Sequence, residues 1–186
     1  MGIVKSKLIK KLANTYPGLL KKDLIKVTNS ETNIYVCHDG HNNKVNEANV
    51  IVREINQNEQ IKVGYFGKLS PQKGLNLLDE IIKNSKPSET IFNIFSPDLE
   101  ALPKYDSIGE YNYIKHEDCY KKMREQDILL MLIEPQNKGD QISAYTSPLK
   151  LFEYMSSGVP ILASDVPILH EILTSNLNAV LCYNQP

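Results

Sequence analysis

The 186 residues are enough for one well-buried domain, and their charges nearly balance, with 21 Lys and Arg against 22 Asp and Glu. A net charge near zero argues against a nucleic-acid-binding protein, which would carry a basic face. No apolar run approaches the roughly 20 residues that span a bilayer, and the sequence shows no signal-peptide pattern, repeat or low-complexity tract. We therefore expect a cytoplasmic protein.

The first 26 residues form a basic segment, with seven lysines against one aspartate. Val4, Leu8, Leu12 and Tyr16 recur at i, i+4 spacing and predict the apolar face of a helix. The lysines are either the solvated side of this helix or a contact to anionic lipid at the membrane surface, and both interpretations stay open.

From residue 61, strands and helices alternate regularly. Strands are predicted at Lys62–Phe66, Ile91–Phe95, Tyr111–Lys115, Ile128–Ile133, Pro160–Ala163 and Ala179–Cys182, and helices at Gln72–Lys86, Asp118–Glu125, Pro148–Ser157 and Pro167–Leu173. Strongly apolar strands alternating with helices predict an α/β fold, a Rossmann-like parallel sheet with helices on both faces. Ligands of such sheets bind beyond the carboxyl ends of the strands.

Two predicted helix starts carry lysines at equivalent positions. Ser70-Pro71 follows the glycine turn after the first strand, and Ser147-Pro148 opens a later helix, in both cases with an N-cap residue before a proline. Lys73 and Lys150 take the third positions, where free N–H groups and partial positive charge attract anions such as phosphate. The alternative is that both, together with Lys68, are ordinary solvated residues.

An acid and several histidines complete the set of candidates. Glu153 lies among the apolar residues of its predicted helix, where a carboxylate either pairs with another group or meets a ligand.

His38 and His41 give only a weak metal signal, so no metal site is expected. For the segment 116–118 we favour an N-cap by Asp118 over a nucleotide contact. For His170 we favour a packing or capping role near the start of a short helix. Cys37, Cys119 and Cys182 are expected to be reduced, buried thiols.

The two lysine-bearing segments together resemble the donor-binding C-terminal domain of retaining glycosyltransferases with the GT-B fold, family 4. The family motif G-[RK]-L-x-x-x-K-G is matched by residues 67–74, and the motif S-P-x-K-x-x-E-Y-x-x-x-G-x-P-[IV]-[IV]-A-S-D is matched from Ser147 to Asp165. Residues 166–171 match the usual continuation, and residues 39–42 match the turn that precedes the donor domain.

The resemblance implies roles for individual residues. Lys68 and Lys73 correspond to the basic pair that binds the pyrophosphate of a nucleotide-sugar, and Glu153 corresponds to the acid that accepts hydrogen bonds from the ribose hydroxyls. The remaining substrate-binding positions implied are Gly67, Tyr145, Thr146, Ser147, Pro148 and Lys150. Tyr145 stands where many members carry a glutamate that contacts the transferred sugar, so this chain departs from the family pattern there.

The activity implied is sugar transfer with retention from a UDP- or GDP-linked donor, in polysaccharide or glycoconjugate biosynthesis. No cofactor or metal is expected, since lysines and helix N-termini stabilise the leaving diphosphate and the chain has no D-x-D triplet. The resemblance divides the chain into a remnant of the acceptor-binding domain (1–40), a linker or hairpin (41–60) and a donor domain shortened at its C-terminus (61–186). We therefore expect an acceptor domain or subunit to act in trans, with this fragment alone inactive.

Two other interpretations remain. The missing acceptor half and Tyr145 favour a non-catalytic module that keeps nucleotide affinity and acts in binding or assembly. A nucleotide-sugar epimerase or a phosphorylase would share the architecture, but the further acids, histidines or cofactor lysine that they need cannot be located.

Overall fold

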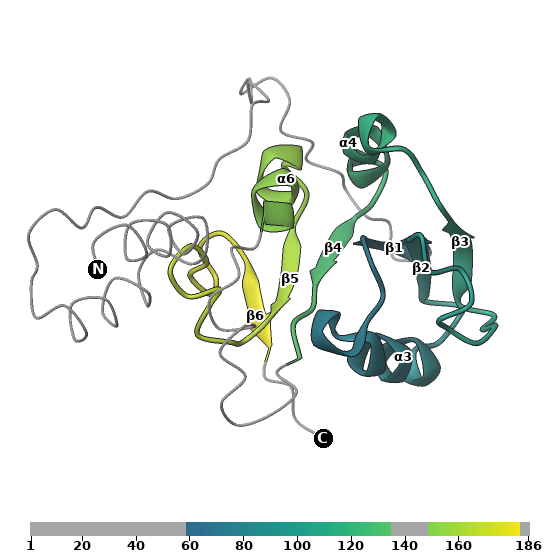
Figure 1. Cartoon of the computed structure of the whole chain (residues 1–186). Coiled ribbons are helices and arrows are strands. Elements are labelled where there is room, and N and C mark those ends of the chain that lie inside the picture. The colour runs from purple at the N-terminus through teal and green to yellow at the C-terminus, as the bar shows by residue number, and fades with distance from the viewer. Residues whose placement is uncertain (1–58, 135–148, 183–186) are drawn as a thin grey trace, which may run out of the picture.

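The computed structural model describes residues 59–134 and 149–182 (Figure 1). These residues form one six-stranded sheet in the order β3-β2-β1-β4-β5-β6, and every neighbouring pair is parallel. The strands are β1 (Ile61–Phe66), β2 (Thr90–Phe95), β3 (Ile108–Asn112), β4 (Ile128–Met131), β5 (Ile161–Ser164) and β6 (Val180–Cys182). The helices are the 3-10 helix η2 (Pro71–Lys73), α3 (Leu75–Asn84), α4 (His116–Arg124) and α6 (Leu149–Ser157). The predicted α/β, Rossmann-like class is confirmed.

The helices cover both faces of the sheet. α3 lies on one face, and α4 and α6 lie side by side on the other (Figure 1). Leu78 and Ile82, spaced four residues apart on α3, bury their side chains against the face of β1 that carries Tyr65. On the other face, α6 buries Leu151 and Tyr154. This strand order places the topological switch point between β1 and β4, where ligands of doubly wound sheets bind.

The first long helix begins later than predicted. Instead of one helix over 72–86, a single 3-10 turn is followed by Gly74 at φ 73°, and α3 starts only at Leu75. A side chain at Gly74 would lie 2.6 Å from Cβ of Leu132, so the backbone closely approaches the residue that follows β4. The Ser70 side chain makes no capping bond. Ser70 and Pro71 therefore do open a helix, as predicted, but it is the short 3-10 helix η2, and the prediction of one continuous helix over 72–86 is wrong.

The third strand lies further toward the N-terminus than predicted, at Ile108–Asn112 instead of Tyr111–Lys115. It is a half-exposed edge strand, and its pairing with β2 shifts register at a bulge between Phe92 and Asn93. The Asn93 side chain accepts a hydrogen bond from the backbone N–H of Glu110 at 3.0 Å. Edge strands lack the strong apolar pattern that marks a buried strand, which explains the error.

Two further predictions about helices are wrong. Residues 167–172 form consecutive turns instead of a helix, and the burial of Ile168, Leu169 and Leu173 fixes these turns in the core. α4 begins at His116, so Asp118 lies in its first turn and is not the N-cap.

Several expectations concern the surface or fall outside the described residues. Cys119 is half-buried and Cys182 is exposed, both as free thiols, so the expected burial is wrong for Cys182. In the parts of the chain that the structure describes, every helix is too short or too polar to cross a bilayer. The regions 1–40 and 41–58, which include Cys37 and both histidines near it, lie outside those parts, as do residues 183–186.

Candidate functional site

The side chain of Tyr65 supports the lysine-bearing loop that follows β1, residues 67–74. The Tyr65 hydroxyl lies 3.0 Å from the carbonyl oxygen of Lys68 and 3.2 Å from that of Lys73, so it can donate to either. Burial, aided by the charge of Asp98, raises the pKa of Tyr65, so the hydroxyl stays protonated and remains a donor. The same Asp98 accepts a hydrogen bond from the backbone N–H of Leu69 at 2.9 Å. Both ends of the lysine-bearing loop are therefore fixed.

The sheet opens between β1 and β4 at its carboxyl edge. β1 pairs with β2 along all six residues but pairs with β4 only at Val63 and Gly64. Beyond that point the backbone N–H of Phe66 donates to the Tyr154 hydroxyl at 3.0 Å. Because Tyr154 belongs to α6, this buried bond ties the helix directly to the end of β1. The opening coincides with the switch point of the sheet.

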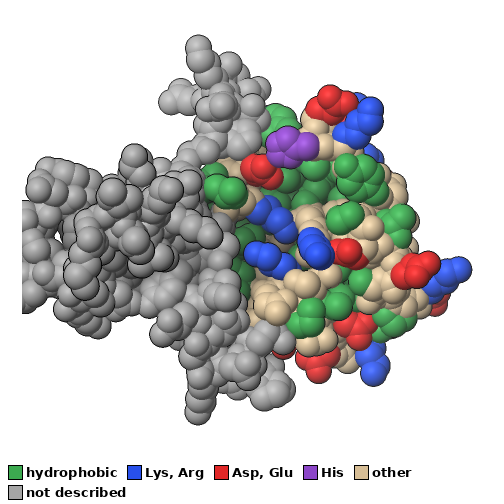
Figure 2. Space-filling model, in the orientation of Figure 1, with side chains coloured by type: hydrophobic (Ala, Val, Ile, Leu, Met, Phe, Trp, Pro, Cys, Tyr) green, Lys and Arg blue, Asp and Glu red, His purple; other side chains and the backbone are tan. Residues whose placement is uncertain are grey.

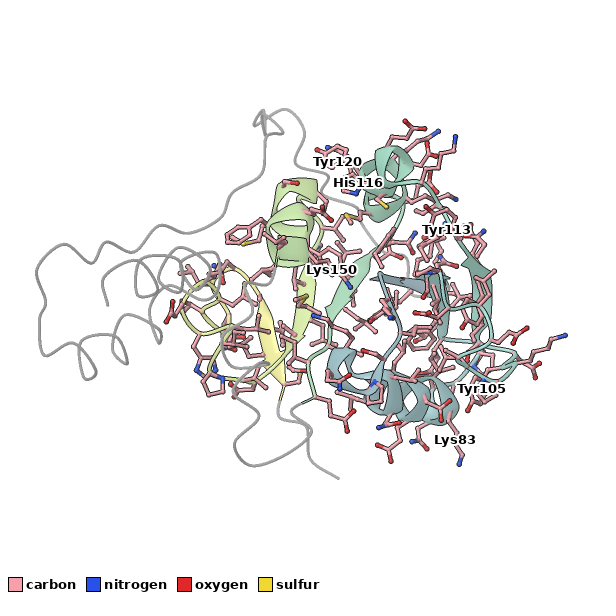
Figure 3. The ribbon with its side chains drawn as sticks, in the orientation of Figure 1. Lys83, Tyr105, Tyr113, His116, Tyr120 and Lys150 are labelled. Atoms are coloured by element: carbon pink, nitrogen blue, oxygen red, sulfur yellow. The ribbon has the colours of Figure 1, made fainter. Side chains whose placement is uncertain are left out.

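Lys150, in the first turn of α6, reaches across this opening toward β1 (Figure 3). Its Nζ atom lies 4.8 Å from the centroid of the Tyr65 ring, within the range of a cation–π contact. A Cβ atom at Gly67 would lie 2.3 Å from this Nζ, so the ammonium group rests where a side chain would otherwise be. Gly67 also has φ 119°, a conformation that favours glycine. The lack of a side chain at Gly67 therefore leaves the space that the Lys150 ammonium occupies.

Charge accumulates around Lys150. Burial, and after it the nearby ammonium of Lys73, lowers the pKa of Lys150 to about 8, although Glu153 and Cys119 act in the opposite direction. Basic side chains gather on this face of the molecule, next to an acidic and a histidine side chain (Figure 2). Lys73 and Lys150 repel each other at this edge of the sheet, so an anion bound between them would stabilise both positive charges.

Glu153 lies one helical turn after Lys150 on α6, with 28% of its side chain exposed. Its Oε1 atom is 3.8 Å from Nε2 of His116, which stands at the start of α4 (Figure 3). The carboxylate therefore borders both the lysines and the neighbouring helix. The sequence left two interpretations of residues 116–118, a helix start and a nucleotide contact, and the position of His116 beside Glu153 follows from the packing of α4 on α6.

The structure brings together four of the residues singled out in the sequence: Gly67, Lys73, Lys150 and Glu153. The side chain of Lys68 is exposed on the same loop, and that of Lys73 is exposed on η2. Tyr145, Thr146, Ser147 and Pro148 lie outside the described residues. His170 pairs with Asp165 at the carboxyl edge of β5, in a segment of turns, not of helix. Within residues 59–134 and 149–182, no three His, Cys, Asp or Glu side chains gather to hold a metal ion.

Comparisons with known proteins give limited similarities. No known family's sequence profile matches the chain. A curated protein of Klebsiella pneumoniae, described as an uncharacterized 41.2 kDa protein in the cps region, is 26% identical over 129 residues. The match covers 67% of this chain and 33% of that protein, so the chain spans about a third of the length of its relative.

Two solved structures are similar at low sequence identity. Anabaena HepE in complex with UDP-glucose is 17% identical with a TM-score of 0.48, covering 67% of this chain and 35% of HepE. The C-terminal domain of LpcC, a glycosyl transferase group 1 family protein from Francisella tularensis, is 18% identical with a TM-score of 0.45, covering 66% of this chain and 67% of that domain. Similarity at this level carries no information on activity, and the fold class rests on the six-stranded sheet itself.

Proposed function

We propose that this chain supplies the nucleotide-sugar-binding part of a retaining glycosyltransferase, with the donor seated at the carboxyl ends of β1 and β4. One observation carries the proposal: Lys150 packs against Gly67 beside Lys73, one helical turn from Glu153. These are the positions at which the two sequence motifs of the family 4 enzymes are matched, and they converge on the switch point where doubly wound sheets bind ligands.

The charges suit the chemistry of sugar transfer. As the bond between the anomeric carbon and the diphosphate oxygen breaks, negative charge grows on the departing nucleoside diphosphate. The ammonium group of Lys150, which packs against Tyr65 and Gly67, would stabilise that charge together with those of Lys73 and Lys68 on the neighbouring loop. Glu153 would accept hydrogen bonds from the ribose hydroxyls. An anion between the lysines would also relieve the repulsion that lowers the pKa of Lys150.

Lysines at this position make a bridging metal unnecessary, and we propose donor binding that does not depend on a divalent cation. Transfer itself would require an acceptor-binding domain or subunit, as the resemblance to the family implies. We place the protein in the cytoplasm, with the lysines of residues 1–26 as a candidate contact to the membrane surface.

A non-catalytic role is the second candidate, and Tyr145 favours it. The family's sugar-contacting glutamate is replaced there, so the site would bind a nucleotide without promoting transfer. The two functions share the diphosphate site and differ only in turnover when an acceptor half is supplied.

Calorimetric titration with UDP, GDP and their sugar conjugates in the presence of EDTA tests the binding site. UDP and UDP-glucose, the ligands named for the HepE structures, are convenient first probes. Lys73→Ala should weaken binding of both nucleotide and sugar conjugate by about 10- to 100-fold, the effect of removing a charge-assisted hydrogen bond. Lys83→Ala is the matched control, because Lys83 is exposed in the last turn of α3, away from the site (Figure 3).

Glu153→Gln separates the ribose contact from the phosphate contact. It should weaken binding of UDP while leaving inorganic pyrophosphate binding nearly unchanged, because only the nucleotide carries ribose hydroxyls. Glu80→Gln, on the exposed face of α3, should change neither. If a folded chain binds none of the nucleotides, or if Lys73→Ala and Glu153→Gln bind as wild type does, the proposed site is wrong.

A further inference from the structure

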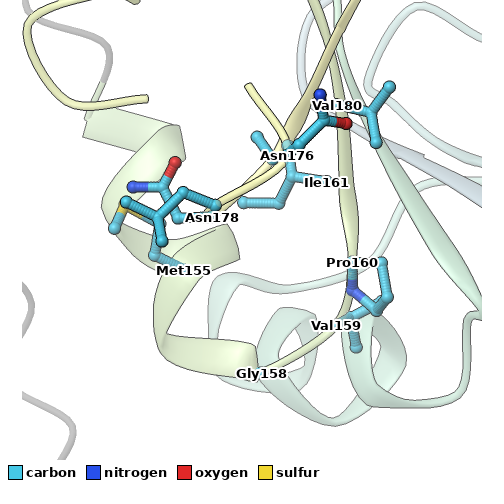
Figure 4. A pocket seen from close by; sticks show the side chains of 10 residues that line it. Met155, Gly158, Val159, Pro160, Ile161, Asn176, Asn178 and Val180 are labelled. Atoms are coloured by element: carbon cyan, nitrogen blue, oxygen red, sulfur yellow. The ribbon is translucent and has the colours of Figure 1, made fainter. Parts of the chain in front are cut away.

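A second surface feature lies at the opposite edge of the sheet from the lysines. It is a groove of about 470 Å³ at the amino ends of β5 and β6, beside the C-terminal end of α6 (Figure 4). The residues that line it are Met155, Gly158, Val159, Pro160, Ile161, Asn176, Leu177, Asn178, Ala179 and Val180. Because the strands are parallel, this edge is remote from the carboxyl ends that form the candidate donor site.

The groove concentrates exposed apolar surface. Among the described residues, six large hydrophobic side chains are exposed, and three of these line the groove: Leu177 at 80%, Val180 at 49% and Met155 at 39%. Single exposed hydrophobic side chains are ordinary, whereas a group of them on one concave surface marks an interaction site.

Two side-chain amides, those of Asn176 and Asn178, are the polar side chains among the described residues that line the groove, and that of Asn178 is already engaged. None of the lining residues that the structure describes carries a charged side chain. The Asn178 amide donates to the carbonyl of Ile172 at 2.9 Å and accepts from the backbone N–H of Thr174 at 2.8 Å. Small polar ligands need convergent hydrogen-bonding groups to fix their orientation, so this lining suits an apolar protein segment better.

We propose that the amphipathic segment of residues 4–16 of this same chain covers the groove, with Val4, Leu8, Leu12 and Tyr16 facing it. These four side chains repeat every four residues and would form one helical stripe, while the lysines between them stay in water. The groove supplies the uncharged surface that such a stripe needs, and this assignment is independent of the proposed function.

The amino end of β1, where the described chain begins, is close enough to the groove for residues 4–16 to reach it. The chain enters the sheet through Glu59 at the amino end of β1, the same edge as the groove. β5 lies two strands from β1, a separation of about 10 Å in a parallel sheet. Residues 17–58 connect the segment to this point, and even a flexible coil of that length spans roughly 35 Å.

A single introduced tryptophan tests the proposal, because the full chain contains none. In Leu177→Trp, the indole should emit as a buried group and resist quenching by acrylamide. Adding Leu8→Asp and Leu12→Asp should shift the emission to the red and raise the quenching constant at least twofold. The matched control adds Ser6→Asp and Asn14→Asp, which introduce the same charge on the opposite helical face and should leave the emission unchanged.

The other outcomes contradict the proposal. An indole that is already exposed without the aspartates shows that the groove stays open. A protected indole that ignores Leu8→Asp and Leu12→Asp shows a different occupant, and protection that depends on protein concentration identifies a second copy of the chain. Hydrogen exchange of residues 159–161 and 176–181 in the wild-type background gives a second readout, since exchange should accelerate with the Leu8 and Leu12 changes but not with the control.

Discussion

The hydroxyl of Tyr154 supports the end of the central strand, and Tyr154→Phe removes only that atom. The β1–β4 ladder ends at Gly64, so the backbone N–H of Phe66 relies on this hydroxyl as its acceptor. Tyr154 is fully buried, and its ring packs edge-on against the ring of Phe66, with centroids 6.2 Å apart, a contact that phenylalanine would keep. The substitution therefore tests one change alone, the loss of the acceptor for the buried backbone N–H of Phe66.

The expected cost follows from that donor. A buried N–H that loses its acceptor costs about 1–3 kcal/mol, so Tyr154→Phe should lower the free energy of unfolding by about 2 kcal/mol, or roughly 30-fold in the unfolding equilibrium constant. Urea unfolding followed by circular dichroism should show a lower midpoint with an unchanged slope. Tyr113→Phe is the control, because Tyr113 is 62% exposed and its change should stay within about 0.5 kcal/mol. If Tyr154→Phe is equally neutral, the hydroxyl does not support β1 as inferred.

Two further predictions concern the lysine site. Gly67→Ala should lower the free energy of unfolding by about 1–3 kcal/mol, because φ 119° strains any other residue. It should also weaken UDP binding, because the new methyl group displaces the Lys150 ammonium. An unaltered UDP affinity would show that the position of this ammonium is unimportant. The pKa of Lys150 falls from 10.5 to about 8 on folding, so the unfolded chain binds more protons in that interval and wild-type stability should rise with pH relative to Lys150→Met. Urea midpoints of both proteins at pH 7.5 and pH 10 measure this difference, and parallel curves would contradict it. Over the same range UDP affinity should fall in the wild type more steeply than in Lys150→Met, as the ammonium loses its proton.

The general architecture could be predicted because its signals are local. Apolar strands and the four-residue spacing of Leu78 and Ile82 depend on neighbours in the sequence, and a parallel sheet necessarily brings the carboxyl ends of its strands to one edge. That is why the sequence predicts Lys73 and Lys150 at the same edge of the sheet, although they are 77 positions apart in the chain.

The details that failed depend on contacts between distant segments. The bond from Phe66 to Tyr154 joins residues 88 apart, and the approach of His116 to Glu153 requires two helices to pack. The single turn before Gly74 reflects the close approach of Leu132, the residue after β4, which no local pattern records. Residues 167–172 carry a helix-like pattern, yet core burial selects turns there.

The pairing of β1 with β4 at only two register positions also affects where the sheet opens most easily during partial unfolding. β1 to β3 come from residues 61–112 and β4 to β6 from residues 128–182. The ladder between β1 and β4 is extended by two bonds of Lys62, whose backbone N–H donates to the Asp127 carboxylate and whose carbonyl accepts from the Asp127 N–H. β1 and β2, in contrast, share six register pairs. The free energy of opening the sheet should therefore be lower at the junction between β1 and β4 than between β1 and β2. A ligand bound across the junction would be coupled to the conformational stability of the whole sheet.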